Sequence, residues 1–428
     1  MLIHSTIDDL RTGVIALPEF LAQVERQYNE REPSIHALVE ETNRFGRLHA
    51  EAEDIMRRYP EQASRPGLFG ALVGVKDIFR VEGFPTQAGS RLPVDLFQGR
   101  EADCVTCLKD AGALILGKTV TTEFAYFAPG PTRNPHNPGH TPGGSSSGSA
   151  AAVAAGFCQV ALGTQTIGSL VRPASFCGVV GLKPTSDRIS RAGVIPLSPS
   201  LDHVGFFAPD VETAIRVAPV LYEHWDEPTL PLRKPRLGVP AGPYLDRTSE
   251  EGRAHFEKVC GLLEQAGYTV QSVPLFSDDS EIQARHHLIL SAEAAQVHEQ
   301  WFGKYASLYS AKLSELIQRG REVSAAQLQA ALDARDQFRA DMRRIFLDHN
   351  LDLWICPATV GAAPMGLEST GDPVMNLPWT QAGLPTLNLP AEKNREGLPL
   401  GLQLVGNWYK DESLLFWARD LEKVLSKQ

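Results

Sequence analysis

The sequence predicts an α/β protein: one large domain in which helices cover both faces of a mixed central β-sheet. Of its 428 residues, 43% are apolar, which is enough for one large buried core. Short apolar runs alternate with helical patterns, most clearly at residues 236–239, 250–266 and 268–273. No internal repeat or low-complexity linker breaks this alternation. Together these features favour a single layered domain.

The first half of the chain begins with helices, since apolar residues recur three and four positions apart within residues 1–60. Residues 67–77 follow as a short apolar strand that ends at the polar pair Lys76 and Asp77. A helix is expected near residues 101–115, leading into a strand at 113–117. Pro, Gly, Asn, His, Thr and Ser dominate residues 128–149, which indicates a long irregular loop, and such loops in compact domains are usually functional or disordered.

Small residues at 150–156 predict a closely packed helix, and residues 159–163 predict a buried strand. Residues 281–348 are almost entirely helical in pattern, with Ser324 as an N-cap and Gln327 in the capping-box position. Strands at 352–357 and 398–405 and a helix at 412–425 complete the chain. We expect four segments of one domain: N-terminal helices (1–60), a core (61–215), a helical and α/β insertion (216–345) and the C-terminal part of the core (346–428).

The composition excludes several functional classes. The net charge of −10 argues against nucleic-acid binding, which requires a basic surface. No run of 18 apolar residues predicts a membrane span, and the first residues do not form the pattern of a signal peptide. Six cysteines in so long a chain are not a disulfide framework, so a reducing cytoplasm is expected.

The cysteines and histidines suggest no metal site. Cys104 and Cys107 form a lone C-x-x-C on a predicted helix, where two buried thiols are expected. The sequence H-E-x-x-H does not occur, which argues against a zinc amidase. His136 and His140 lie in a Pro-Asn loop and are interpreted as turn residues. We therefore expect no metal and no cofactor.

The segment from Thr141 to Ala150, TPGGSSSGSA, is the most unusual in the chain. Its glycines permit close backbone approach, and the helix behind it directs its positive end toward the loop. A phosphate-binding P-loop would need a Lys after the second Gly, and none is present. A nucleophile elbow centred on Ser146 would need a preceding strand, but the proline-rich residues 134–140 cannot form one.

A third interpretation uses residues elsewhere in the chain. Lys76 ends one apolar strand, and another strand ends in the turn Gly163-Thr-Gln-Thr-Ile-Gly-Ser169. With the Gly-Ser loop, Gly181-Leu-Lys-Pro-Thr and residues 400–406, these motifs resemble the amidase signature family in order and spacing. The resemblance covers most of the chain and implies that family's single α/β domain and amide-hydrolysing activity.

The resemblance assigns roles to individual residues. Ser169 matches the acyl-forming nucleophile, Ser145 matches a bridging serine that the family holds in a cis peptide, and Lys76 matches the general base. The backbone amides of Thr166, Ile167, Gly168 and Ser169 match the oxyanion hole. The family commonly has Gly at the position of Ile167, and a β-branched residue disfavours positive φ, so a differently shaped turn is expected. Asp202 matches a family position and is interpreted as structural support.

The implied chemistry is physically consistent. A serine hydroxyl is a weak nucleophile until a base accepts its proton, and a lysine is a base only when it is neutral. Burial in an apolar environment lowers a lysine pKa from its usual value of about 10.4, because the charged form loses its hydration. The apolar flank of Lys76 is consistent with such burial.

The substrate is less well defined by the sequence. Arg172 lies three residues after Ser169 and resembles the arginine with which malonamidase-type members bind a small acidic substrate; a structural arginine is the alternative. Phe124, Tyr126 and Phe127 precede the Gly-Ser loop and, with Trp379, are expected near the substrate, although core packing would explain them equally well. The expected partner is a small-molecule amide, with no nucleic acid and no membrane.

Two other functions are compatible with these motifs. The family includes glutamine-hydrolysing subunits of tRNA-dependent amidotransferases, and it could also include a catalytically silent binding homologue. The presence of all three residues of the Ser–Ser–Lys set argues against the silent homologue. The family resemblance implies a homodimer.

Overall fold

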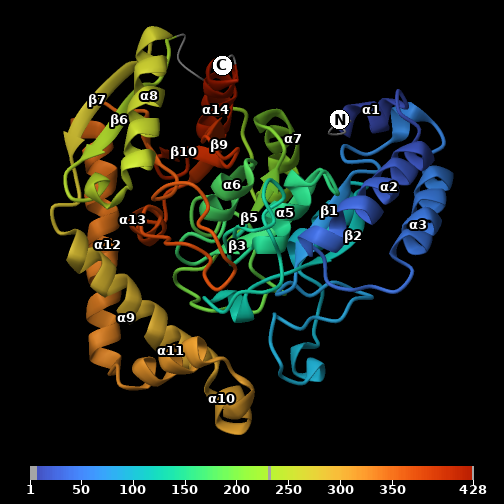
Figure 1. Cartoon of the computed structure of the whole chain (residues 1–428), viewed down its shortest axis with the longest axis horizontal. Coiled ribbons are helices and arrows are strands. Elements are labelled where there is room, and N and C mark those ends of the chain that lie inside the picture. Colours follow the sequence, from blue (N-terminus) through green and yellow to red (C-terminus); the bar gives the residue numbers. More distant parts are fainter. Residues whose placement is uncertain (1–6, 230–232, 427–428) are drawn as a thin grey trace.

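The computed structural model describes residues 7–229 and 233–426, and within them a ten-stranded mixed sheet forms the centre of the molecule (Figure 1). The strand order is β2-β1-β3-β5-β4-β9-β10-β8-β6-β7. The strands are β1 (Leu72–Lys76), β2 (Leu114–Thr119), β3 (Val160–Gln165), β4 (Val180–Lys183), β5 (His203–Ala208), β6 (Arg236–Ala241), β7 (Thr269–Pro274), β8 (Leu353–Pro357), β9 (Thr386–Lys393) and β10 (Pro399–Gly406). The predicted α/β fold with a mixed sheet is confirmed.

The sheet is parallel at its two ends and antiparallel in the middle. Strand β1 pairs in parallel with β2 and β3, and β6 pairs in parallel with β7 and β8. Strands β5, β4, β9 and β10 form the antiparallel centre. One parallel part meets this centre where β3 pairs antiparallel with β5, and the other meets it where β8 pairs antiparallel with β10.

Helices pack on both faces of the sheet. Alternate residues of β1 show this, because Val73 and Val75 belong to one buried apolar cluster whereas Leu72 belongs to the other. The same alternation separates Leu162 from Ala161 in β3. The flanking helices include α2 (Leu17–Ile35), α3 (Arg44–Arg58), α5 (Ser147–Ala154) and α6 (Val171–Cys177) on one side, and α4 (Asp103–Asp110), α7 (Val211–Leu221), α8 (Glu250–Gln265) and α14 (Asp411–Leu425) on the other.

A group of helices extends from the sheet near β6 and β7 (Figure 1). It consists of α9 (Asp279–Val297), α10 (Glu299–Tyr305), α11 (Ala311–Arg321) and α12 (Ala325–Asp348). Helix α12 begins with the predicted capping box, in which Ser324 and Gln327 bond reciprocally. The remaining helices are α1 (Ile7–Thr12) and α13 (Leu377–Gln381), with 3₁₀ turns at Gln62–Ser64, Val94–Phe97, Glu123–Ala125, Leu245–Arg247 and Ala306–Leu308.

The C-x-x-C pair differs from its prediction. Cys104 is buried in α4, but Cys107 is exposed, because the buried face of that short helix is formed by Cys104, Val105 and Leu108. Among residues 7–229 and 233–426, no helix has the length and apolar character that crossing a membrane requires. Residues 1–6, on which part of the signal-peptide prediction rests, lie outside the described residues.

Candidate active site

Lys76 lies at the carboxyl end of β1, between β2 and β3, and its side chain is completely buried. Its Nζ lies 2.7 Å from Ser145 Oγ and 2.8 Å from Thr164 Oγ1. Burial lowers the pKa of Lys76 well below its ordinary value, and the nearby Asp202 carboxylate opposes this shift only in part. This shift favours the neutral form of the amine, which lies within hydrogen-bond distance of the Ser145 hydroxyl.

Ser145 lies in the Gly-Ser loop just before α5. The Gly144–Ser145 peptide bond is cis, as the family resemblance implied, and the Ser145 carbonyl accepts a hydrogen bond of 3.2 Å from the backbone N–H of Thr122. The next residue fixes the loop against β3, since Ser146 Oγ accepts from the Thr164 N–H and donates to the Thr164 carbonyl. The loop thereby brings the Ser145 hydroxyl to Lys76.

Ser169 lies in the turn between β3 and α6. The Gln165 side chain holds this turn, because its Oε1 accepts from the backbone N–H groups of Leu170 and Val171 at 2.8 and 3.0 Å. No described residue accepts a hydrogen bond from the N–H groups of residues 166–169. Ile167 has no positive φ, so this turn accommodates a β-branched residue without strain. The free amides are available to bind an oxyanion.

Asp202 supports the Ser169 turn through Thr166 and does not itself line the pocket that contains Ser169. One carboxylate oxygen accepts from the Thr166 hydroxyl at 2.5 Å, and the other accepts from the backbone N–H groups of Leu197 and Ser198 at 2.8 and 3.0 Å. Burial raises the pKa of Asp202, and these hydrogen bonds act against that rise. The interactions are those of a supporting residue that joins the turn to the 197–198 segment.

Ser145 and Ser169 line the same narrow pocket, which we call the nucleophile pocket. Its volume is about 10 Å³, room for roughly one water molecule. The residues that line it are Ala125, Tyr126, Phe127, Ser145, Thr166, Ile167, Ser169, Arg172, Leu197, Thr370 and Pro373. This confined space brings together the Ser145 hydroxyl, which contacts the buried Lys76 amine, the Ser169 hydroxyl and the free amides of the turn. Acyl transfer requires such an arrangement.

Arg172 lies in α6 at the wall of the nucleophile pocket and is buried. Its guanidinium donates to the carbonyls of Gly371 at 2.5 Å and Gly144 at 2.7 Å, and to the Thr370 hydroxyl at 3.1 Å. No carboxylate of the described chain lies within ion-pair distance of it, although Asp372 acts on its charge from further away, and its Nε has no hydrogen-bond partner. Burial lowers its pKa to about 9, which leaves it charged at neutral pH. Arg172 is thus both a brace for the Gly-Ser loop and a buried cation that no carboxylate contacts directly.

The predicted aromatic residues lie in different places. Tyr126 and Phe127 line the nucleophile pocket, but Phe124 does not: it is buried among Phe97, His298, Trp301 and Tyr309. Trp379 is also fully buried, with its Nε1 donating to the Tyr244 hydroxyl at 2.9 Å and its ring against Phe276 and Trp354. Core packing therefore accounts for Phe124 and Trp379.

Thr164 is the contact that sequence reasoning missed. The sequence of residues 163–169 predicts a turn but does not indicate that the Thr164 hydroxyl of β3 approaches Lys76 of the neighbouring β1. Among the residues that the structure describes, no group of three His, Cys, Asp or Glu side chains could hold a metal ion.

Comparisons with known proteins show what the chain as a whole is similar to. A family model described as Amidase matches residues 19–415. A glutamyl-tRNA(Gln) amidotransferase subunit from Prochlorococcus marinus (strain NATL2A) is 30% identical, over 98% of this chain and 97% of that protein. A solved amidase structure superposes with a TM-score of 0.88 at 29% identity, covering 98% of both chains. The peptide amidase of Stenotrophomonas maltophilia gives 0.80 at 26% identity, over 99% of this chain and 97% of that one.

Proposed function

This chain belongs to the amidase family and is an amide-hydrolysing enzyme, and on that premise we propose that Ser169, Ser145 and Lys76 are its catalytic triad. The observation that carries the proposal is the fully buried Lys76 amine 2.7 Å from the Ser145 hydroxyl. Its lowered pKa supplies the neutral form that a general base must have.

In the proposed reaction, Ser169 Oγ attacks the amide carbon while its proton passes through Ser145 to Lys76. The amides of residues 166–169 bind the oxyanion, a contribution of roughly 3–4 kcal/mol per donor in a comparable enzyme. The proton then returns through Ser145 to the leaving nitrogen, the C–N bond breaks, and an acyl-enzyme remains. Water hydrolyses this ester, and the acid is released with Ser169 regenerated.

A panel of small amides, aryl amides and ureas, with detection of ammonia and amines, tests this function on the full chain. Hydrolysis that depends on Ser169 supports it. Turnover that survives loss of Ser169 would assign the chemistry to another group.

We further propose that the acyl part of the substrate carries a carboxylate that Arg172 binds. The support is a charged guanidinium beside the nucleophile that, among the described residues, has no carboxylate in direct contact and only Asp372 acting on it from further away. Arg172→Ala is expected to reduce kcat/KM for malonamate roughly 10- to 100-fold, mostly through KM, because a charge-assisted hydrogen bond contributes about 1.5–3 kcal/mol. Steady-state kinetics on malonamate and propanamide measure the effect.

Propanamide is the control in this comparison, because it lacks the carboxylate. Equal losses on both amides would mean that Arg172 only braces the Gly144 and Gly371 carbonyls. An Arg172→Ala variant that melts at a lower temperature but keeps its kcat/KM for malonamate would point to the same conclusion.

Asp202 provides a prediction about pH. Its carboxylate raises the pKa of Lys76, against the larger effect of burial. Asp202→Asn removes this charge, so the pKa of Lys76 falls further and the rise of kcat/KM with pH moves to lower pH. A pH–rate profile of both enzymes checks this. A profile that moves to higher pH would contradict the proposed electrostatic contact.

A second candidate function follows from the similarity to amidotransferase subunits. Eight relatives of this kind are 30–34% identical to this chain. By analogy, the chain would hydrolyse glutamine and pass the ammonia to a partner. Glutaminase activity that appears only with a co-purified partner would favour this function over that of an independent amidase.

The family resemblance also leads us to propose a homodimer in the cytoplasm. All six cysteines are free, which suits a reducing compartment. Light scattering of the purified chain measures the oligomeric state.

A further inference from the structure

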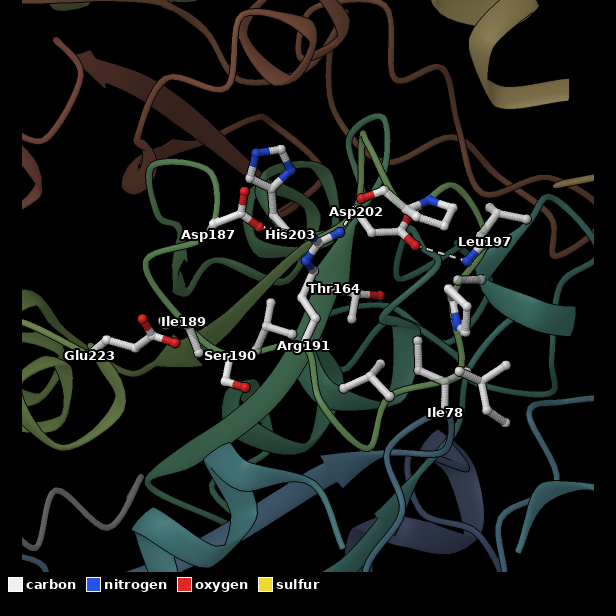
Figure 2. Close-up of a pocket in the computed structure, with 16 residues that line it drawn as sticks. Ile78, Thr164, Asp187, Ile189, Ser190, Arg191, Leu197, Asp202, His203 and Glu223 are labelled. Atoms are coloured by element: carbon white, nitrogen blue, oxygen red, sulfur yellow. Dashed lines mark hydrogen bonds and ion pairs between the residues drawn. The ribbon is translucent and has the colours of Figure 1, made fainter. Parts of the chain in front are cut away.

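A large chamber adjoins the nucleophile pocket, and neither Ser145 nor Ser169 lines it. Its volume is about 490 Å³. Figure 2 shows Thr164 and Asp202 at its wall and Glu223 at the end away from Leu197 and Ile78. We call it the lateral chamber.

The lateral chamber and a second cavity both border the nucleophile pocket. Ala125 and Leu197 line both the lateral chamber and the nucleophile pocket. Tyr126, Phe127 and Pro373 line both the nucleophile pocket and another open cavity of about 480 Å³, which we call the vestibule. The two larger cavities have no lining residue in common. The nucleophile pocket, which Ser169 lines, therefore lies between two larger spaces that can each hold one part of a substrate.

The position of the proton relay indicates which part enters which space. The leaving nitrogen must receive its proton from Ser145, which is in contact with Lys76. Thr164 contacts the same amine and lines the lateral chamber. Arg172, in contrast, donates to the carbonyl of Gly371, which lines the vestibule. The leaving group is thus directed to the lateral chamber and the acyl group to the vestibule side.

The walls of the lateral chamber suit an amine with an apolar body. Aliphatic side chains form much of its surface, including Ile78, Ile189, Val194, Ile195, Leu197 and Val204. Its charged residues are Asp187, Asp202, Glu223 and Arg191. Arg191 pairs with Asp187 at 2.7 Å, which leaves an excess of negative charge. An ammonium group is attracted by such a surface, and an alkyl chain gains by burial against it.

We propose that the lateral chamber holds the leaving group and that this group is an organic amine with an apolar body, so that the preferred substrates are N-alkyl amides. This inference rests on the proposed function, because it takes Ser169 as the nucleophile and Ser145 as the donor to the leaving nitrogen.

The test uses the product side of the reaction on the full chain. Calorimetry with ethyl-, butyl- and hexylammonium should give affinities that rise about two- to fourfold for each added methylene. Val194→Trp should remove this dependence on chain length and weaken hexylammonium at least tenfold. Val94→Trp, a matched change at a partly exposed valine outside the chamber, should leave the whole series unaltered.

Turnover supplies the second measurement. The ratio of kcat/KM for N-hexylmalonamate to that for malonamate should fall at least tenfold in Val194→Trp and stay constant in Val94→Trp. Glu223→Lys changes an exposed position and so avoids the risk of misfolding; it should weaken hexylammonium roughly two- to fivefold.

Affinities independent of chain length in the wild type would overturn the proposal. Equal effects of Val194→Trp and Val94→Trp would also overturn it. A failure of the catalytic assignment can be distinguished from a failure of this proposal. If Ser169 were not the nucleophile, Ser169→Ala would retain hydrolysis, and the alkylammonium affinities would still test the lateral chamber.

Discussion

Ser169→Ala is expected to lower kcat about a millionfold for every amide that the enzyme hydrolyses, as loss of a triad serine does in a comparable hydrolase. The alanine lacks the oxygen that would form the acyl-enzyme, while Lys76, Ser145 and the free amides of the turn stay in place. Ammonia or amine release under saturating substrate measures the loss. Mass spectrometry of the wild type during turnover should detect an acyl group on Ser169 that the variant lacks.

Ser147→Ala is the matched control for this experiment. Ser147 lies two residues after Ser145, at the first position of α5, and is also buried, but its hydroxyl faces the Val120 carbonyl at 3.4 Å and it does not line the nucleophile pocket. Its activity should stay within about threefold of the wild type, since only a weak hydrogen bond is lost. Similar losses in both variants would indicate damage to the loop rather than removal of a nucleophile.

The positions of the candidate catalytic residues could be predicted because each is tied to a local feature of the sequence. Lys76 ends an apolar strand, and strand ends meet at the edge of a parallel pair such as β1 and β3. Ser145 and Ser169 each lie in a turn rich in glycine and serine just before a helix, α5 in one case and α6 in the other. The Thr164 contact could not be predicted, because it depends on the register of two strands 88 positions apart in sequence.

Aromatic residues were predicted less well, for a physical reason. A large ring near a catalytic motif can line a pocket or fill the core, and its sequence environment is apolar in both cases. Tyr126 and Phe127 border the nucleophile pocket, whereas Phe124 and Trp379 pack among other rings. Only the tertiary structure separates these outcomes.

Strand β9 is a second feature that local sequence alone does not determine. Pro390 lies within this strand, and proline usually excludes a central strand because it cannot donate to the ladder. The pairing of β9 with β4 ends at Asn388, so Pro390 needs no donor on that side, and the pairing of β9 with β10 shifts register near Gly401. The strand is therefore compatible with its proline for reasons that local sequence does not contain.

Lys76→Met is expected to lower kcat about 10²- to 10⁴-fold, the usual contribution of a general base, and to remove the rise of activity with pH. In the wild type, activity should increase as Lys76 loses its proton and should then level off, because burial sets its pKa well below the ordinary value. Lys183→Met is the control, since Lys183 is equally buried and has a pKa lowered to about 7, but its amine donates to the Pro184 carbonyl and not to Ser145. Activity of the Lys183→Met variant should still rise with pH.

Lys76→Met lowers activity but is expected to raise the stability of the folded chain relative to the wild type. Between the lowered pKa of folded Lys76 and the value of about 10.4 in the unfolded chain, only the unfolded chain binds the proton. Unfolding then takes up a proton, so the wild type becomes more stable as pH rises through this window, and Lys76→Met lacks this dependence. The melting temperature of the variant minus that of the wild type should therefore be greatest below the folded pKa and should shrink toward pH 10.4. A difference that grows with pH would mean that the buried amine is held in its charged form, and a charged amine at position 76 could not take a proton from Ser145.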